Sequence, residues 1–88
     1  MNTESMLDEL LRLLEKAGVE VRTEQMGGGG GGVCSVKGKN IVFLDSQGNM
    51  RERAAVCAKA LAKAVDVEKV YMKPEVRQFV EHESKRND

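Results

Sequence analysis

Four side chains in this sequence have types that carry chemistry in other proteins: Cys34, Asp45, Cys57 and His82. A thiol beside a histidine can serve as nucleophile and base, two thiols can form a redox pair, and thiols with a histidine can bind zinc. The four are far apart in the chain and fall in different predicted elements, so no recognisable motif joins them. We therefore expect no catalytic residue, metal site or cofactor, and keep these four as candidates if a site exists.

Both cysteines fit positions in a hydrophobic core. Cys34 alternates with Val36 along a predicted strand, and Cys57 lies in the middle of the apolar stripe of a predicted helix. Burial in apolar surroundings raises the pKa of a thiol and makes it unreactive. We predict two free, structural cysteines rather than a redox pair, metal ligands or a catalytic thiol.

The other two candidates also have simple structural interpretations. His82 is the only histidine and lies in a charged C-terminal segment, which would have to fold back to reach either cysteine. Asp45 ends an apolar strand just before a helix, a common place for a catalytic carboxylate or a metal ligand. No second carboxylate is expected to converge on it, so a cap of the turn that leads to Asn49 is the simpler interpretation.

The glycine run at 27–32 contains the spacings of phosphate-binding loops, as any run of glycines does. Such a loop needs a helix that begins at the glycines, or a Lys and a Ser or Thr directly after them. Here Val33 and Cys34 follow and begin a strand. We predict a flexible surface loop that belongs to neither neighbouring element. A lid over a small-molecule ligand is the alternative.

Apolar periodicity predicts one α+β domain over residues 1–88. A capping-box pair, Ser5 and Asp8, precedes a helix that stops at Gly18, and Val19 to Glu24 alternates as a strand. The remaining expected elements are a hairpin of strands 33–37 and 41–45, a helix capped by Asn49, an extended segment near 70–72, a helix from Pro74 and a frayed charged tail at 82–88. The core stripe expected for the second helix is Met50, Ala54, Cys57, Ala58, Leu61 and Val65.

This order of elements predicts a three-stranded, mostly antiparallel sheet with the two main helices on one face and a short C-terminal helix. Helices on one face leave the other face open. Either the segment 71–80 covers that face, or the face or an edge strand forms a homodimer.

Composition excludes several classes of partner. The chain has 14 basic and 14 acidic residues, so it lacks the positive charge that drives binding to nucleic acid. No apolar run approaches the roughly 20 residues that a membrane span needs, and the first five residues are polar and acidic, unlike a secretory signal. We expect a cytoplasmic protein.

The strand 41–45, then Arg51 and Arg53, then an alanine-rich helix resembles the minimal zincin-type metallopeptidase domains of the ImmA/IrrE family. In the matching register the segment 59–63, Lys-Ala-Leu-Ala-Lys, stands where that family has His-Glu-x-x-His. The resemblance therefore implies an inactive relative without zinc chemistry. The chain is also similar to small bacterial proteins with a glycine-rich loop before a Cys-x-Val-x-Gly-Lys hairpin, and that resemblance implies no activity.

The sequence thus favours a non-enzymatic interaction or binding module whose partner is another protein or a second copy of the chain. The alternatives are a cysteine-dependent enzyme or redox protein using Cys34 or Cys57, a small-molecule binder, and an inactive peptidase relative.

Overall fold

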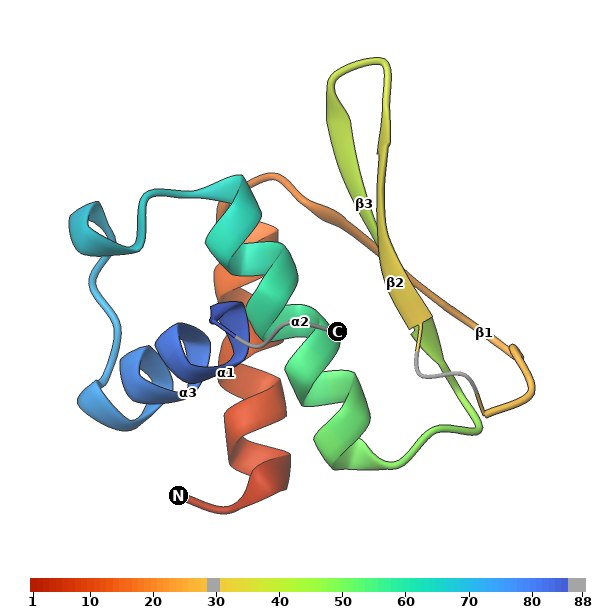
Figure 1. Cartoon of the computed structure of the whole chain (residues 1–88), viewed down its shortest axis with the longest axis horizontal. Helices are drawn as coiled ribbons and strands as arrows, with labels where there is room; N and C mark the ends of the chain where they lie inside the picture. Colours follow the sequence, from red (N-terminus) through yellow and green to blue (C-terminus); the bar gives the residue numbers. More distant parts are fainter. Residues whose placement is uncertain (29–30, 86–88) are drawn as a thin grey trace.

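The computed structural model describes residues 1–28 and 31–85. Its elements are α1 (Thr3–Lys16), β1 (Glu20–Glu24), β2 (Gly31–Val36), β3 (Lys39–Asp45), α2 (Met50–Ala64), the short 3-10 helix η1 (Val67–Lys69) and α3 (Pro74–Ser84). The three strands form one sheet, and α1 and α2 lie side by side against one face of it (Figure 1). The predicted α+β class is confirmed.

The sheet has the order β1-β3-β2, so the last strand in the chain lies in the centre. β2 and β3 form the predicted antiparallel hairpin, whereas β1 is parallel to β3. The sheet is therefore mixed, with one pairing of each kind. Lys37 and Gly38 both have positive φ in the two-residue turn of the hairpin, a geometry that matches the twist of the two strands.

Asparagine side chains cap the two main helices. The Asn49 side chain accepts a hydrogen bond from the backbone N of Glu52 at 2.8 Å, as predicted for α2. The expected start of α1 was wrong: Asn2, not Ser5, is its N-cap, and the Asn2 side chain accepts from the backbone N of Ser5 at 2.7 Å. The difference is small because both asparagine and serine satisfy the free amides of a first helical turn.

The segment before α3, expected to be extended near 70–72, has an extended backbone at Val70 (φ −112°, ψ 130°) but is not a strand of the sheet. The guanidinium of Arg77 donates to the carbonyl oxygens of Val67 at 2.7 Å and Val70 at 2.8 Å. These carbonyls are held by a side chain from α3 and not by a neighbouring strand. Pro74 occupies the first turn of α3, as predicted.

The hydrophobic core lies between the helices and one face of the sheet, which we call the inner face. Val42 and Leu44 of the central strand point into it and belong to one cluster with side chains of the helices, of which α2 contacts β3 most. The core residues contributed by the helices are Leu7, Leu10, Leu14, Ala54, Cys57, Ala58, Ala60, Leu61, Val76 and Val80. Met50, expected in this core, is 42% exposed because it lies at the very start of α2.

The last helix packs against α2 on the side away from the sheet (Figure 1). It therefore leaves the second face of the sheet bare, contrary to the alternative that the segment 71–80 covers it. Residues 82–84 of the predicted frayed tail belong to α3, and Glu83 is only 2% exposed. The remainder of that tail, residues 86–88, lies outside the described residues.

Candidate functional site

The four candidate residues lie in separate surroundings. Cys57 is fully buried in the core, Asp45 is buried at the end of β3, and Cys34 and His82 are exposed on β2 and α3. Within residues 1–28 and 31–85, no group of three or more His, Cys, Asp or Glu side chains is placed to hold a metal ion. The structure does not bring these candidates together into one site.

Cys57 has the environment of a structural cysteine. Its side chain lies in the core among Ala54, Ala58 and Leu61, and desolvation raises its pKa to about 12 despite the opposing effect of the Arg53 charge. A thiol with this pKa carries almost no thiolate at neutral pH, so it is a poor nucleophile and a poor metal ligand.

Cys34 is exposed, so the prediction that it belongs to the core was wrong. Side chains alternate between the two faces of a strand, and in β2 it is Val33 that packs against the core. Cys34 and Val36 therefore point to the opposite face, which no helix covers in the described structure. The alternation was read correctly, but the sequence did not say which half of it faces inward.

Asp45 holds a turn together. One of its carboxylate oxygens, Oδ1, accepts hydrogen bonds from the backbone N of Gln47 at 2.9 Å and of Met26 at 3.1 Å. The first bond shapes the turn after β3, and the second ties the chain leaving β1 to that turn. The carboxylate thus performs the turn-capping role expected from the sequence.

The glycine run is partly built into the sheet, so the prediction that it belongs to neither element was wrong. Gly31 pairs with Leu44 and Gly32 pairs with Phe43 at the start of β2. Gly31 has a φ of +102°, and a Cβ atom there would lie 2.0 Å from the carbonyl oxygen of Phe43. Only glycine fits that position. Gly29 and Gly30 lie outside the described residues.

The side of the sheet that no described helix covers, which we call the outer face, is mostly apolar along β2 and β3. Its residues are Gly32, Cys34 and Val36 of β2 with Lys39, Ile41 and Phe43 of β3, placed on one face by the strand register. Val36 is 47% exposed and Phe43 is half-buried, and neither contacts the core. Sequence reasoning anticipated an open face but did not identify its residues.

On the outer face, the side chain of Phe43 lies next to open space at Gly32. Phe43 and Gly32 are paired neighbours across the hairpin, and a Cβ atom added at Gly32 would meet nothing within 4 Å. On β1, the charges of Arg22 and Glu20 are already paired with each other. The face therefore has the Phe43 ring beside open space at Gly32, next to a β1 border that carries Glu20, Arg22 and Glu24.

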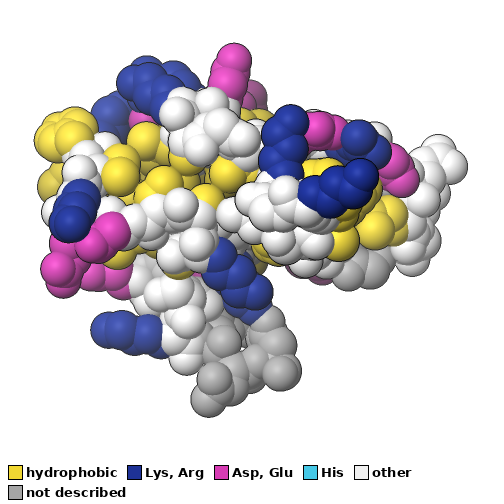
Figure 2. Space-filling model, turned by 90° about the horizontal axis from the view of Figure 1, so that it is seen from above, with side chains coloured by type: hydrophobic (Ala, Val, Ile, Leu, Met, Phe, Trp, Pro, Cys, Tyr) yellow, Lys and Arg dark blue, Asp and Glu magenta, His cyan; other side chains and the backbone are white. Residues whose placement is uncertain are grey.

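Two hollows adjoin on the helical side of the molecule. The larger, about 400 Å³, is lined by Leu13, Lys16, Ala17, Leu61, Val65, Val70 and Tyr71, and we call it the Tyr71 groove. Seen from above, Figure 2 shows hydrophobic side chains gathered over the helices, with Lys and Arg side chains along their border. The smaller hollow, about 90 Å³, shares Leu13, Lys16 and Tyr71 with the groove and adds Glu9, Arg12, Met72 and Lys73.

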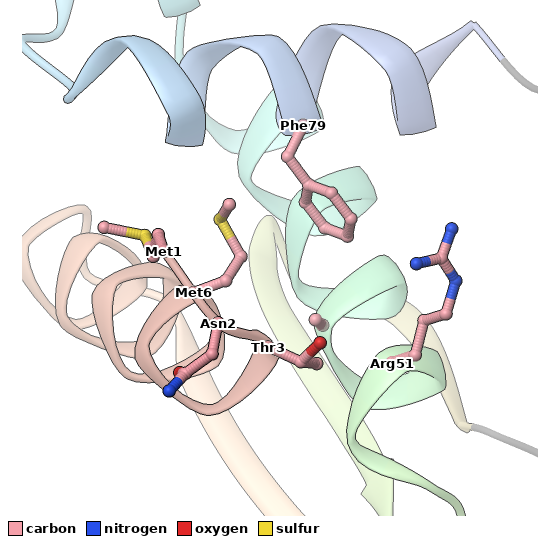
Figure 3. A pocket seen from close by; sticks show the side chains of 7 residues that line it. Met1, Asn2, Thr3, Met6, Arg51 and Phe79 are labelled. Atoms are coloured by element: carbon pink, nitrogen blue, oxygen red, sulfur yellow. The ribbon is translucent and has the colours of Figure 1, made fainter.

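A third hollow lies where the N-terminus meets α2 and α3. The side chains of Met1, Met6 and Phe79 border it on one side and Arg51 on the other (Figure 3). Its volume is about 70 Å³, well below the several hundred Å³ of pockets that bind organic ligands. We assign no binding role to it.

Comparisons with protein-family models, with curated proteins and with solved structures found no match to this chain. No helix among the described residues is both long enough and apolar enough to cross a membrane. Two surfaces of the described structure could bind a partner or a ligand, the outer face and the Tyr71 groove.

Proposed function

We propose that this protein is a non-enzymatic interaction module that associates with a second copy of itself through the outer face. The observation that carries the proposal is the position of the three helices, which all lie on the other side of the sheet. Cys34, Val36 and part of Phe43 are thereby left in water, whereas Ile41 on the same face is only 9% exposed. Covering them with a second sheet removes apolar surface from water, the main driving force of protein association.

The shape of the outer face favours a second copy as the partner. In a two-fold dimer the same patch faces itself. An aromatic side chain that lies beside open space, as Phe43 lies beside Gly32, can then fill the open space of the other copy. A two-fold axis that runs along the strands between β2 and β3 sets the Phe43 ring of each copy over the open space at Gly32 of the other. Sheets packed face to face lie about 10 Å apart, a spacing that side chains from both faces fill.

The test is the mass of the protein in solution across a concentration series, measured by size-exclusion chromatography with light scattering. We expect the mass to rise from one chain towards two chains as the concentration increases. Val36→Lys places a charge on the outer face and should shift this rise to at least about tenfold higher concentration. Met50→Lys is the matched control, because Met50 is also exposed and apolar, at 42% against 47% for Val36, but lies away from the sheet.

Cys34 provides an independent readout of the same interface. It lies on the outer face close to the proposed axis, and Cys57 is buried and protonated, so mild oxidation should give a Cys34-linked dimer that Cys34→Ser abolishes. A mass of one chain at every concentration would overturn the proposal. Equal effects of Val36→Lys and Met50→Lys on a dimer would locate the interface elsewhere.

A further inference from the structure

We infer that the Tyr71 groove is a binding site for a small amphipathic carboxylate, with an aliphatic or aromatic body in the groove and its carboxylate beside Lys16. The groove lies at the C-terminal ends of α1 and α2 and under the segment between η1 and α3. It shares no residue with the outer face. The inference is therefore independent of the self-association proposed above.

The size and lining of the groove fit a small molecule. Its volume of about 400 Å³ falls in the range of about 300–1,000 Å³ that ligand pockets occupy. Five of its seven lining residues are aliphatic, and the only polar side-chain atoms are the Tyr71 hydroxyl and the Lys16 ammonium.

The charges around the groove select an anion. Lys16 borders both adjoining hollows, and Arg12 and Lys73 border the smaller one. The acidic residue there, Glu9, is paired with Arg12 and lies 3.6 Å from the Nζ atom of Lys73. Its hydrogen bond with Arg12 lowers the pKa of Glu9, which therefore stays ionised.

The side chains at this end, three cations and one carboxylate, sum to two positive charges, which outweigh the negative dipole ends of α1 and α2 at about half a charge each. Lys16 has no ion-pair partner among the residues that the structure describes. An incoming carboxylate would therefore gain an attraction without displacing an existing partner. A cationic ligand would meet repulsion at the same place.

One wall of the groove is held in place before any ligand arrives. Arg77 ties the carbonyl groups of Val67 and Val70 to α3, which fixes the segment that carries Tyr71. Tyr71 is nevertheless 84% exposed, so most of its ring is available to cover an apolar ligand. A fixed wall lowers the ordering cost of binding, and an exposed ring supplies contact area.

The experiment uses decanoate as the probe, below its micelle concentration, with backbone-amide NMR of the full chain. We expect concentration-dependent shifts at Leu13, Val65 and Tyr71, and little change on the outer face. Decan-1-ol should bind more weakly than decanoate, and decyltrimethylammonium should bind least. No shift in the groove, or tighter binding of the cation than of decanoate, would contradict the inference.

Three variants locate the ligand. Lys16→Glu replaces attraction by repulsion and should weaken decanoate binding about tenfold. Lys63→Glu, an equal charge change in the last turn of α2 outside the groove lining, is the matched control. Tyr71→Ala should weaken binding about fivefold without affecting folding, since Tyr71 is so exposed. Ala17→Phe, on an exposed residue of the lining, should fill the groove and remove binding.

The outcomes separate the possible occupants. Equal weakening by Lys16→Glu and Lys63→Glu would reduce the effect to net charge and overturn the site. Groove amides that shift with protein concentration and not with decanoate would assign the groove to a second copy of the chain, and would also overturn it. Failure of decanoate to bind would leave the mass measurements on Val36→Lys unaffected, so the two proposals fail separately.

Discussion

The two faces of the three-stranded sheet differ in how far helices cover them. Val42 and Leu44 on the inner face are almost completely buried under the helices, whereas Val36 and Phe43 on the outer face have no helix over them. Both pairs are apolar; the inner pair comes from β3 alone and the outer pair from β2 and β3. Apolar residues in a strand therefore indicate a face that is more stable when buried. They do not indicate whether the same chain or a partner buries it.

The two cysteines express the same difference chemically. Cys57 lies under the inner face with a pKa of about 12, whereas Cys34 lies on the outer face in contact with water. Identical side chains become a packing element in one place and an accessible thiol in the other. Each of the following predictions compares one inner position with one outer position.

The largest difference is expected between Leu44→Ala and Phe43→Ala. Leu44 is 3% exposed in the core, so its truncation removes buried methyl groups and leaves a cavity, at a cost of about 3 kcal/mol. Phe43→Ala should cost about 1 kcal/mol or less, because its ring is half-buried and outside the core. Urea unfolding at low protein concentration measures both, and equal losses would show that the outer face is packed within the monomer.

A smaller contrast is expected between the two glycines at the start of β2. Gly31→Ala forces a positive φ on alanine and a clash with the backbone of Phe43, so it should destabilise by about 2 kcal/mol. Gly32→Ala should be neutral or stabilising by about 0.5 kcal/mol, since its Cβ atom meets open space and glycine weakens a strand.

Thermal or urea unfolding of the two glycine variants provides the measurement. Gly32→Ala also fills part of the open space beside Phe43 on the outer face. It should therefore weaken the dimer while preserving the fold. A destabilisation of similar size in both variants would mean that the open side of Gly32 is occupied in the folded monomer.

A pH dependence caused by Cys57 has no effect at neutral pH and appears only above pH 9. Its thiol keeps its proton in the folded state up to a pKa of about 12, but ionises near its ordinary pKa of about 9 when the chain unfolds. The raised pKa makes a contribution that is fully present below pH 9 and is lost at about 1.4 kcal/mol per pH unit between pH 9 and 12. Stability should therefore fall as the pH rises through this range.

The pH effect is isolated by comparing variants. The slope of unfolding free energy against pH above 9 should be shallower in Cys57→Ala than in the wild type by about 1.4 kcal/mol per unit. Cys34→Ala should keep the wild-type slope, because Cys34 is exposed in the folded chain. Identical slopes in all three proteins would place Cys57 in contact with water.

Local signals in the sequence predicted most of the elements. Asn49 with Glu52 marked the start of α2, Pro74 the start of α3, and Lys37 with Gly38 lay inside the segment predicted to turn the hairpin. These predictions held because capping and turn geometry depend on a few adjacent residues. That the extended segment at 70–72 joins no strand depends on distant residues, since the carbonyl group of Val70 is held by Arg77 from the next helix.

By itself, the sequence determined that three consecutive strands stand between helices and that apolar residues recur at core spacing. Only the tertiary structure decided that Cys57 faces the core and Cys34 does not, that Gly31 must be glycine, and that Tyr71 borders a groove with Lys16. The physical reason is that alternation along a strand is symmetric between its two faces. The two faces become different only when the helices pack against one of them.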